Sequence, residues 1–364
     1  MDSMSHIMTL DPRRSRDAGR RLRDIARQDF ERLQAQLAAI DLAGATLLIT
    51  GATGFFGAWL LALLDHLAAS SAPGVRVYAV SRDPEAFLAR HAWARSLPWL
   101  EWIRGDIRDF EFPHGEVDAV VHAATETSAA AAQAPAVLLD SVISGTRRTL
   151  DCAAHCGAKR ILLVSSGGVY GAQPLTLESI PEDAQIAPST LNPRNAYGEA
   201  KRVMEMLGAI HAQQYGAVVS IARCFTFVGP GLPLNAHFAI GNFIRDALVG
   251  DRITIAGDGS AIRSYMYAAD LAIWLLRILQ HGAGGRAYNV GSESALSIAE
   301  LARLVARTVA PQCPVLIEGK AVASPVGNRY LPSVRRAHEE LGLDNWTEPG
   351  LAVLQTAAWA QEVL

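Results

Sequence analysis

The sequence predicts an α/β protein: a doubly wound parallel sheet with helices on both faces and a smaller C-terminal domain. Two observations carry this prediction. Short apolar runs, rich in β-branched residues, alternate along the chain with longer segments of helical periodicity. A turn with three glycines joins the first of these runs to the helical segment after it. The chain has 364 residues, 50% of them hydrophobic, so it can bury a large core and form two domains.

We expect residues 1–44, which precede the first strand, to form an N-terminal helical extension. Its apolar residues recur at the spacing of an amphipathic helix: Ile25, Phe30, Leu33, Leu37 and Ile40. Its arginines are interspersed with acids. A polybasic recognition arm and a solvated helix packed on its own domain both fit this pattern. The acids favour the second interpretation because they offset much of the arginine charge.

The stretch LLITGATGFFGAWLL, residues 47–61, combines a strand, a turn and the start of a helix. The apolar run at its start is typical of a buried parallel strand, and three glycines follow it at a spacing of three. The first glycine permits a tight turn, the second lets backbone approach a pyrophosphate, and the third allows close helix–strand packing. An ordinary turn does not explain this spacing, so we predict a dinucleotide site at the helix N-terminus. The expected cofactor contacts are Gly51, Thr53, Gly54, Phe55, Phe56 and Gly57.

The second predicted strand, VRVYAV at residues 75–80, ends in Ser81 and Arg82. At this position an Asp or Glu would accept hydrogen bonds from the adenosine ribose hydroxyls. An arginine can instead pair with a 2′-phosphate, which a carboxylate would repel. Ser81 and Arg82 therefore favour NADP(H), with NAD(H) still possible. The alternative is that Arg82 is only a solvated charge at the strand end.

Two further strand ends are expected to face the cofactor. The strand that ends near residue 104 is followed by an aspartate that could lie near an adenine. The buried strand over residues 117–122 is followed by two alanines, whose small side chains leave room for a cofactor across the sheet. The predicted contacts are Asp106, Ile107, Ala123 and Ala124.

A strand predicted at residues 160–165 leads into Ser166, and Tyr197 and Lys201 open a long helix further on. A Tyr and a Lys four residues apart lie on one helical face. A nearby ammonium favours the phenolate, which lowers the tyrosine pKa and lets the group exchange protons near neutrality. Taken alone, this pair could also be a coincidence on an amphipathic helix.

Further motifs follow this pair along the sequence. They are Arg223-Cys224-Phe225, Gly257-Asp258-Gly259-Ser260 with Arg263, Tyr265 and Asp270, Tyr288-Asn289-Val290-Gly291, and Tyr330-Leu331-Pro332. Together with the glycine turn they resemble the extended short-chain dehydrogenase/reductase family, the NAD-dependent epimerases and dehydratases that modify nucleotide sugars. The resemblance runs from about residue 45 to residue 342.

The resemblance implies a role for each matching residue. Tyr197 would be the general acid/base, and Lys201 would hold the nicotinamide ribose hydroxyls and lower the Tyr197 pKa. Ser166 would hydrogen-bond the reacting sugar oxygen, with Ser165 as the less favoured occupant of that role. Arg263 would clamp the substrate diphosphate, because a guanidinium donates two parallel hydrogen bonds to phosphate oxygens.

The resemblance also implies an architecture and partners. Residues 45–225 would form a dinucleotide-binding (Rossmann) domain, and residues 226–364 a substrate-binding domain whose chain crosses back to the first. The ligand would be a nucleotide-diphosphate sugar. Helices beginning near Pro135 and Tyr197 would form a homodimer interface.

Two departures from the family pattern narrow the chemistry. Family dehydratases have Asp-Glu directly after the Ser or Thr, and family decarboxylases resemble the Glu-bearing pattern, whereas this chain has Gly167-Gly168. Glycine can neither protonate a leaving hydroxyl nor take a proton from carbon. The sequence therefore disfavours dehydration and decarboxylation. Val142 stands where the family usually offers an Asn, which affects the hydrogen bonds behind the site.

Composition limits the partners and the compartment. The formal net charge of −3 gives no reason to expect nucleic acid or a membrane surface as a partner, and the apolar runs are too short to span a bilayer. Four cysteines in a chain of this length form no disulfide framework, so we expect a reducing cytoplasm. Cys152 and Cys156 flank His155 on a predicted helix, but this segment offers too few ligands, and no metal site is expected.

Three functional hypotheses follow. The first is a reductase of a 4-keto nucleotide sugar that consumes NADPH in each turnover. The second is a 4-epimerase that oxidises and then reduces the sugar with tightly bound NAD. The third, of a different class, is a dinucleotide-binding sensor without catalysis. The intact set of Ser166, Tyr197 and Lys201 counts against the third.

Overall fold

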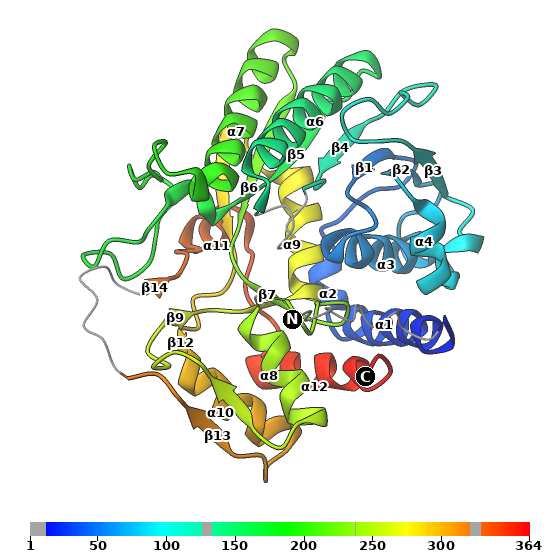
Figure 1. Ribbon diagram of the computed structural model, residues 1–364. Coiled ribbons are helices and arrows are strands. Elements are labelled where there is room, and N and C mark those ends of the chain that lie inside the picture. Colours follow the sequence, from blue (N-terminus) through cyan, green and yellow to red (C-terminus); the bar gives the residue numbers. More distant parts are fainter. Residues whose placement is uncertain (1–11, 126–132, 237, 321–328) are drawn as a thin grey trace, which may run out of the picture.

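A computed structural model of the chain describes residues 12–125, 133–236, 238–320 and 329–364. Its centre is a seven-stranded parallel sheet in the order β11-β6-β5-β4-β1-β2-β3 (Figure 1). The predicted doubly wound fold is confirmed. From β1 the strand order runs outward in both directions, so a crevice is expected at the carboxyl ends of β1 and β4. The strands are β1 (Thr46–Thr50), β2 (Arg76–Ser81), β3 (Leu100–Arg104), β4 (Ala119–His122), β5 (Arg160–Ser166), β6 (Val218–Cys224) and β11 (Arg286–Val290).

Helices cover both faces of the sheet, and the sheet separates two apolar cores (Figure 1). Side chains alternate along each strand, so Leu47 and Ile49 point into one core and Leu48 into the other. Both faces are buried, and the strands are therefore apolar almost throughout. The helices are α3 (Phe55–Ser70) and α9 (Ala268–His281) on one face, and α6 (Pro135–His155) and α7 (Ala196–Tyr215) on the other.

The second half of the chain builds a smaller group of elements beside the carboxyl edge and also returns to the sheet through α9 and β11. Short strands in this group form three small sheets, β10-β7, β12-β9-β14 and β13-β8. Further helices are α4 (Pro84–Arg90), α8 (Ala239–Val249), α10 (Ile298–Val309), α11 (Arg335–Leu341) and α12 (Pro349–Ala360). The short strands are β7 (Phe227–Val228), β8 (Ile253–Ile255), β9 (Ile262–Arg263), β10 (Met266–Tyr267), β12 (Leu296–Ser297), β13 (Val315–Ile317) and β14 (Arg329–Tyr330). Three 3₁₀ turns cover Ala92–Ser96, Gly167–Tyr170 and Pro193–Asn195.

The N-terminal extension is part of the core. It forms α1 (Pro12–Arg32) and α2 (Gln34–Leu37), and α1 contacts α3, α4, α9 and α12. Leu22 and Phe30 are fully buried, and the Phe30 ring meets Trp59 of α3 edge-on at 6.1 Å. The apolar stripe of this helix therefore packs on its own chain, and its arginine-rich side faces solvent.

A buried polar network ties α1 to the end of the chain. Tyr267 donates to a carboxylate oxygen of Asp29 at 2.6 Å, and Arg32 donates to both Asp29 and Thr347. The backbone N–H and the hydroxyl of Thr347 donate to Asp270 at 3.0 and 2.8 Å. Burial raises the pKa of Asp270 to about 7 despite these bonds, and it also raises the pKa of Asp29.

Replacing Phe30 with Ala should destabilise the whole protein. The change opens a cavity between α1 and α3, and such truncations typically cost about 3–5 kcal/mol of unfolding free energy. Gln28→Ala, at an exposed position of the same helix, is the matched control and should leave the free energy of unfolding nearly unchanged. Urea unfolding of both variants measures this, and equal midpoints would show that α1 is not part of the core.

Asp270 should make stability depend on pH. Its folded pKa of about 7 lies above the ordinary value of 3.8, so between these values the folded protein holds a proton that the unfolded chain has released. The free energy of unfolding contributed by this group is therefore fully present at low pH and is lost as the pH rises toward 7. From about pH 5 to about pH 8, wild type should lose roughly 1–3 kcal/mol more than Asp270→Asn. Parallel pH curves for the two proteins would contradict this.

Candidate active site

The glycine turn has the crowding that a dinucleotide cradle requires. Gly51 has a φ of +74°, and a Cβ there would lie 2.6 Å from the carbonyl carbon of Ala123. A Cβ at Gly57 would lie 2.3 Å from the carbonyl carbon of Ala52. At Gly54, at the start of α3, the nearest atom would be the Gly51 carbonyl oxygen at 3.4 Å, an ordinary contact, so this position is much less crowded. The turn therefore fits a pyrophosphate that approaches Gly54 and the N–H groups of α3.

Two arginines stand at the tips of β2 and β3. Ser81 pairs with Arg104 in the sheet register, and the Arg104 Nε donates to the carbonyl of Arg82 at 3.5 Å. The Ser81 hydroxyl lies 3.5 Å from that of Thr53 in the glycine turn, so this tip adjoins the cradle. Sequence analysis missed Arg104. Its position at the end of the third strand, beside Ser81, was the available signal.

The remaining cofactor candidates lie at neighbouring strand ends. Arg108 donates to a carboxylate oxygen of Asp106 at 2.7 Å, and this hydrogen bond lowers the pKa of Asp106. Asp106 is thus an ionised acceptor beyond β3. Ile107 lies close to α6, since a Cβ at Gly145 would be 2.9 Å from its side chain. Ala124 donates its N–H to the Thr50 hydroxyl at 3.3 Å, which holds the end of β4 against β1.

Ser166 and Tyr197 lie together at the end of β5. The Ser166 hydroxyl oxygen accepts the N–H of Gly168 at 3.0 Å, and a Cβ on Gly168 would touch the Tyr197 ring at 3.5 Å. Burial raises the pKa of Tyr197, and a hydrogen bond with Ser166 opposes this shift. The Ser165 hydroxyl donates instead to Glu205 at 2.6 Å. The geometry therefore places Ser166, and not Ser165, beside Tyr197.

Lys201 does not have the expected effect on Tyr197. Its ammonium donates to the Val164 carbonyl at 2.7 Å and to the Thr125 hydroxyl at 2.8 Å, and lies 6.0 Å from the centre of the Tyr197 ring. Burial lowers the pKa of Lys201 to about 8. The pKa of Tyr197 is raised rather than lowered, because burial outweighs the opposing hydrogen bond with Ser166. Sequence analysis also missed Thr125, whose hydroxyl meets Lys201 only through the fold.

Tyr330 is a further hydroxyl at the site. It pairs with Arg263 in the β14–β9 register, and its ring lies 4.6 Å from that of Phe225. A Cβ on Gly167 would come within 2.4 Å of the Tyr330 oxygen. Burial raises the pKa of Tyr330, and a hydrogen bond with Ser166 opposes the shift. Sequence analysis identified Tyr330 only as part of a motif and gave it no role.

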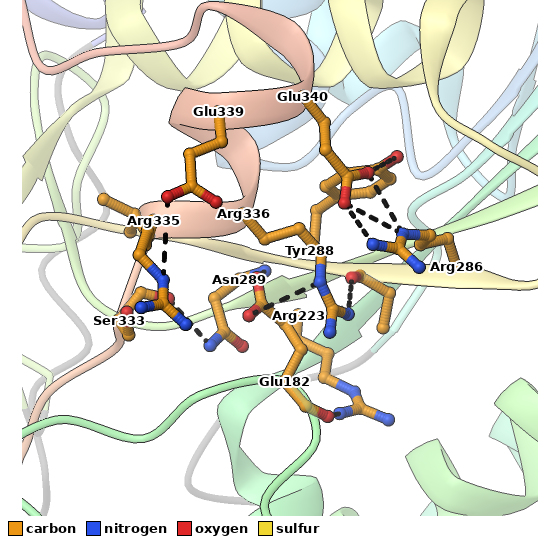
Figure 2. Close-up of polar contacts among 12 residues, drawn as sticks. Glu182, Arg223, Arg286, Tyr288, Asn289, Ser333, Arg335, Arg336, Glu339 and Glu340 are labelled. Carbon is orange, nitrogen blue, oxygen red and sulfur yellow. Dashed lines mark hydrogen bonds and ion pairs between the residues drawn. The ribbon is translucent and has the colours of Figure 1, made fainter.

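A set of polar contacts holds two loop segments against the sheet edge beside the site (Figure 2). The Asn289 side chain donates to the carbonyls of Ile180 and Ser333 at 2.8 and 3.0 Å. Glu182 accepts the Asn289 N–H at 2.9 Å, and Arg223 donates to the Glu182 carbonyl at 2.9 Å. Residues 180–182 and 331–333 are therefore fixed to the ends of β6 and β11.

Arg263, the predicted diphosphate ligand, lies on β9 and donates to the carbonyl of Ile262 at 2.8 Å. Its neighbour in the β9–β14 register is Tyr330, which lies beside Ser166. A cavity of about 410 Å³ opens close by, among α8, β8, the turn after β8 and the start of α10. Its lining includes Asn242, Phe243, Ile255, Gly257 and Ile298.

Behind the site, His122 is a packed residue. Its two ring nitrogens lie 2.8 Å from the Thr50 hydroxyl and 3.1 Å from the Thr146 hydroxyl, and burial lowers its pKa to about 3. Val142, where the family usually has an Asn, is buried in the apolar core. Over the described part of the chain, no three His, Cys, Asp or Glu side chains are grouped to bind a metal. None of the helices described there is both long and apolar enough to cross a membrane.

Comparisons with known proteins agree with this geometry. The model of the NAD dependent epimerase/dehydratase family matches residues 47–291. UDP-glucuronic acid decarboxylase 6 of Arabidopsis thaliana is 29% identical over 81% of this chain and 83% of its own length. A dTDP-4-dehydro-6-deoxy-D-allose reductase of a Streptomyces species is 31% identical over 72% of this chain and 81% of its own length. Among solved structures, RMD of Pseudomonas aeruginosa, complexed with NADPH, is similar with a TM-score of 0.70 at 25% identity, over 88% of this chain and all of RMD (100%).

The family model matches two thirds of the sequence, and the parallel sheet and the glycine turn lie within the matched part or at its edges. Relatives in this range of identity include a decarboxylase and a reductase of nucleotide sugars. On this evidence the chain belongs to the NAD-dependent epimerase/dehydratase family, within the extended short-chain dehydrogenases/reductases.

Proposed function

We propose that this protein is an NADPH-dependent reductase of a 4-keto nucleotide sugar. The observation that carries this proposal is the crowding after Ser166. Gly167 and Gly168 offer no carboxyl group, and the Tyr330 hydroxyl fills the space that a side chain on Gly167 would need. The site therefore has groups for moving a proton at a sugar oxygen, and has none at these positions for eliminating a hydroxyl.

The mechanism follows from the site's own hydroxyls. The C4 carbonyl oxygen of the substrate would accept hydrogen bonds from Ser166 and Tyr197. When bound, the reduced nicotinamide supplies the hydride to C4. Tyr197 gives its proton to the oxygen, so the ketone becomes a carbinol and the tyrosine becomes a phenolate. Lys201 would hold the nicotinamide ribose, and the Tyr197 phenolate would regain a proton from solvent before the next turnover. Burial keeps Tyr197 a phenol before the reaction, which suits a general acid in the reductive direction.

The relatives include other chemistries. The Arabidopsis relative is named a decarboxylase, at 29% identity, and the Streptomyces relative a reductase, at 31%. These values do not separate the two reactions. Gly168 favours reduction over decarboxylation, because the family decarboxylases resemble the pattern with a Glu at this position. The reductase hypothesis needs no group that this chain lacks at the site.

The cofactor preference rests on the basic tip of β2 and β3. Arg82 and Arg104 lie next to each other where the adenosine ribose is expected, and Ser81 stands where NAD enzymes have a ribose-binding carboxylate. The nearest acid, Asp83, caps α4 by accepting the N–H of Ala86 and lies 3.9 Å from Arg104. Two guanidinium groups favour a 2′-phosphate. The similar RMD structure is also a complex with NADPH.

The substrate side would be built by residues 226–364. The cavity of about 410 Å³ falls within the usual range for small-molecule sites, about 300–1,000 Å³. We assign the nucleoside to this cavity and the diphosphate to Arg263, which is two residues from Ala261 in the cavity lining and is paired with Tyr330 in the sheet register. The sugar would then extend toward Ser166 and Tyr197.

The assembly is proposed to be a cytoplasmic homodimer. Apolar side chains remain exposed on the outer faces of α6 and α7, and a second copy could cover them. They are Val137, Met206, Ile210 and Tyr215. The four cysteines are free thiols, which fits a reducing compartment.

The second candidate is a 4-epimerase with tightly bound NAD, since Ser166, Tyr197 and Lys201 would serve both reactions. A panel of dTDP- and UDP-4-keto sugars with NADPH separates them. The reductase should oxidise NADPH in step with the carbinol formed, which NMR identifies at C4. Interconversion of two sugar epimers without added reductant would contradict the proposal. A protein that binds the dinucleotide but turns over no sugar would be the sensor.

Tyr197→Phe should abolish turnover while the fold and the NADPH affinity stay nearly intact. The ring still packs beside Gly168, but the proton donor is gone, and such a loss is typically about 10²–10⁴-fold in kcat. Stopped-flow NADPH oxidation and fluorescence titration measure the two quantities. A variant within a few-fold of wild-type kcat would remove Tyr197 from the acid/base role.

Arg82→Asp should reverse the cofactor preference. The change removes a cationic partner of the 2′-phosphate and adds a repelling carboxylate, so the NADPH/NADH ratio of kcat/KM should fall roughly ten- to a hundredfold. Arg76→Asp makes the same charge change at the opposite end of β2 and serves as the matched control. A wild-type enzyme that already prefers NADH would contradict this assignment.

A further inference from the structure

Three hydroxyl groups from distant parts of the chain meet at the end of β5. Ser166 ends that strand, Tyr197 opens α7, and Tyr330 lies on β14. Tyr330 reaches the other two across Gly167, where a Cβ would come within 2.4 Å of its oxygen. Glycine at position 167 is therefore what admits the Tyr330 hydroxyl to the site.

The hydrogen-bonding capacity of Ser166 limits which of these groups can receive its proton. A serine hydroxyl has one proton to donate and two lone pairs to accept with. The N–H of Gly168 takes one lone pair at 3.0 Å. If Tyr330 donates to the second, both lone pairs are filled, and the one proton of Ser166 is left for Tyr197 or the reacting oxygen.

Tyr330 is suited to be a permanent donor. Burial raises its pKa, so the group remains a phenol with a proton to give. Its position is fixed by its surroundings, because the ring packs against Phe225 with the ring centres 4.6 Å apart. The next residue, Leu331, is held by two backbone hydrogen bonds. Its N–H donates to the Gln173 side chain and its carbonyl accepts the N–H of Ile180, both at 2.9 Å.

We infer that Tyr330 is a positioning residue that orients the Ser166 hydroxyl, so that the proton of Ser166 points at the oxygen that reacts. The inference rests on the proposed function of the same site and adds a third hydroxyl to it. Tyr330 acts through Ser166 and need not touch the sugar.

Tyr330→Phe tests the inference, because the ring and its contact with Phe225 remain while the hydroxyl is lost. We expect kcat for keto-sugar reduction to fall about five- to tenfold, with KM and NADPH affinity within about twofold of wild type. The alkaline limb of the kcat–pH profile should move to higher pH, since a less ordered Ser166 stabilises the Tyr197 phenolate less.

The decisive comparison uses Ser166→Ala. If Tyr330 acts through Ser166, Tyr330→Phe should change kcat less than about twofold once Ser166 has been replaced. A full five- to tenfold loss in that background would overturn the inference and place Tyr330 on the substrate. An unchanged kcat in the wild-type background would overturn it as well.

A matched control and a substrate-free measurement complete the test. Tyr170 is also buried and lies 6.2 Å from Phe225, but its hydroxyl donates to Asn289 at 2.8 Å. Tyr170→Phe should lower the Tm without moving the pH profile. The Tm losses of Ser166→Ala and Tyr330→Phe should be less than additive in the double variant. Additive losses refute the Tyr330–Ser166 contact even if no keto sugar is reduced, whereas coupled losses with no turnover refute only the proposed function.

Discussion

The site depends on one geometric constraint: the strands of the main sheet are parallel, so their carboxyl ends share an edge. The end of β1 brings the glycine turn, β2 and β3 bring Ser81 and Arg104, and β5 brings Ser166. Each of these groups lies at or directly after the end of a strand, so no long loop is needed to bring them together. The crowding at Gly51 and Gly57 then brings α3 against the sheet and leaves Gly54 open to a phosphate.

Burial decides which protonation states this edge presents. It raises the pKa of Tyr197 and Tyr330 and lowers that of Lys201 to about 8, because each charged form loses solvent. The two tyrosines are therefore proton donors, as a carbonyl reduction requires. The same effect in the N-terminal network raises the pKa of Asp270, where it affects stability and lies away from the chemistry.

Local patterns could be predicted from the sequence, and contacts between distant segments could not. The glycine turn and the Tyr197–Lys201 pair are local in sequence, and the structure places both at the carboxyl edge. Arg104 and Tyr330 reach the site through strand register and loop packing, which spacing does not encode. The expected lowering of the Tyr197 pKa was wrong for this arrangement, since the depth of burial is a property of the fold. The helical extension was expected, but its fully buried Phe30 shows that it belongs to the core.

We propose that this site exchanges a reduced cofactor in each cycle and so works as a reductase. The most direct measurement is to denature the purified protein, release whatever dinucleotide it carries, and determine its identity and redox state by mass spectrometry. For a reductase, the dinucleotide should be NADP(H), and it should be lost on extensive dialysis before denaturation. A stoichiometric amount of NAD that survives dialysis would contradict it and establish the epimerase in its place.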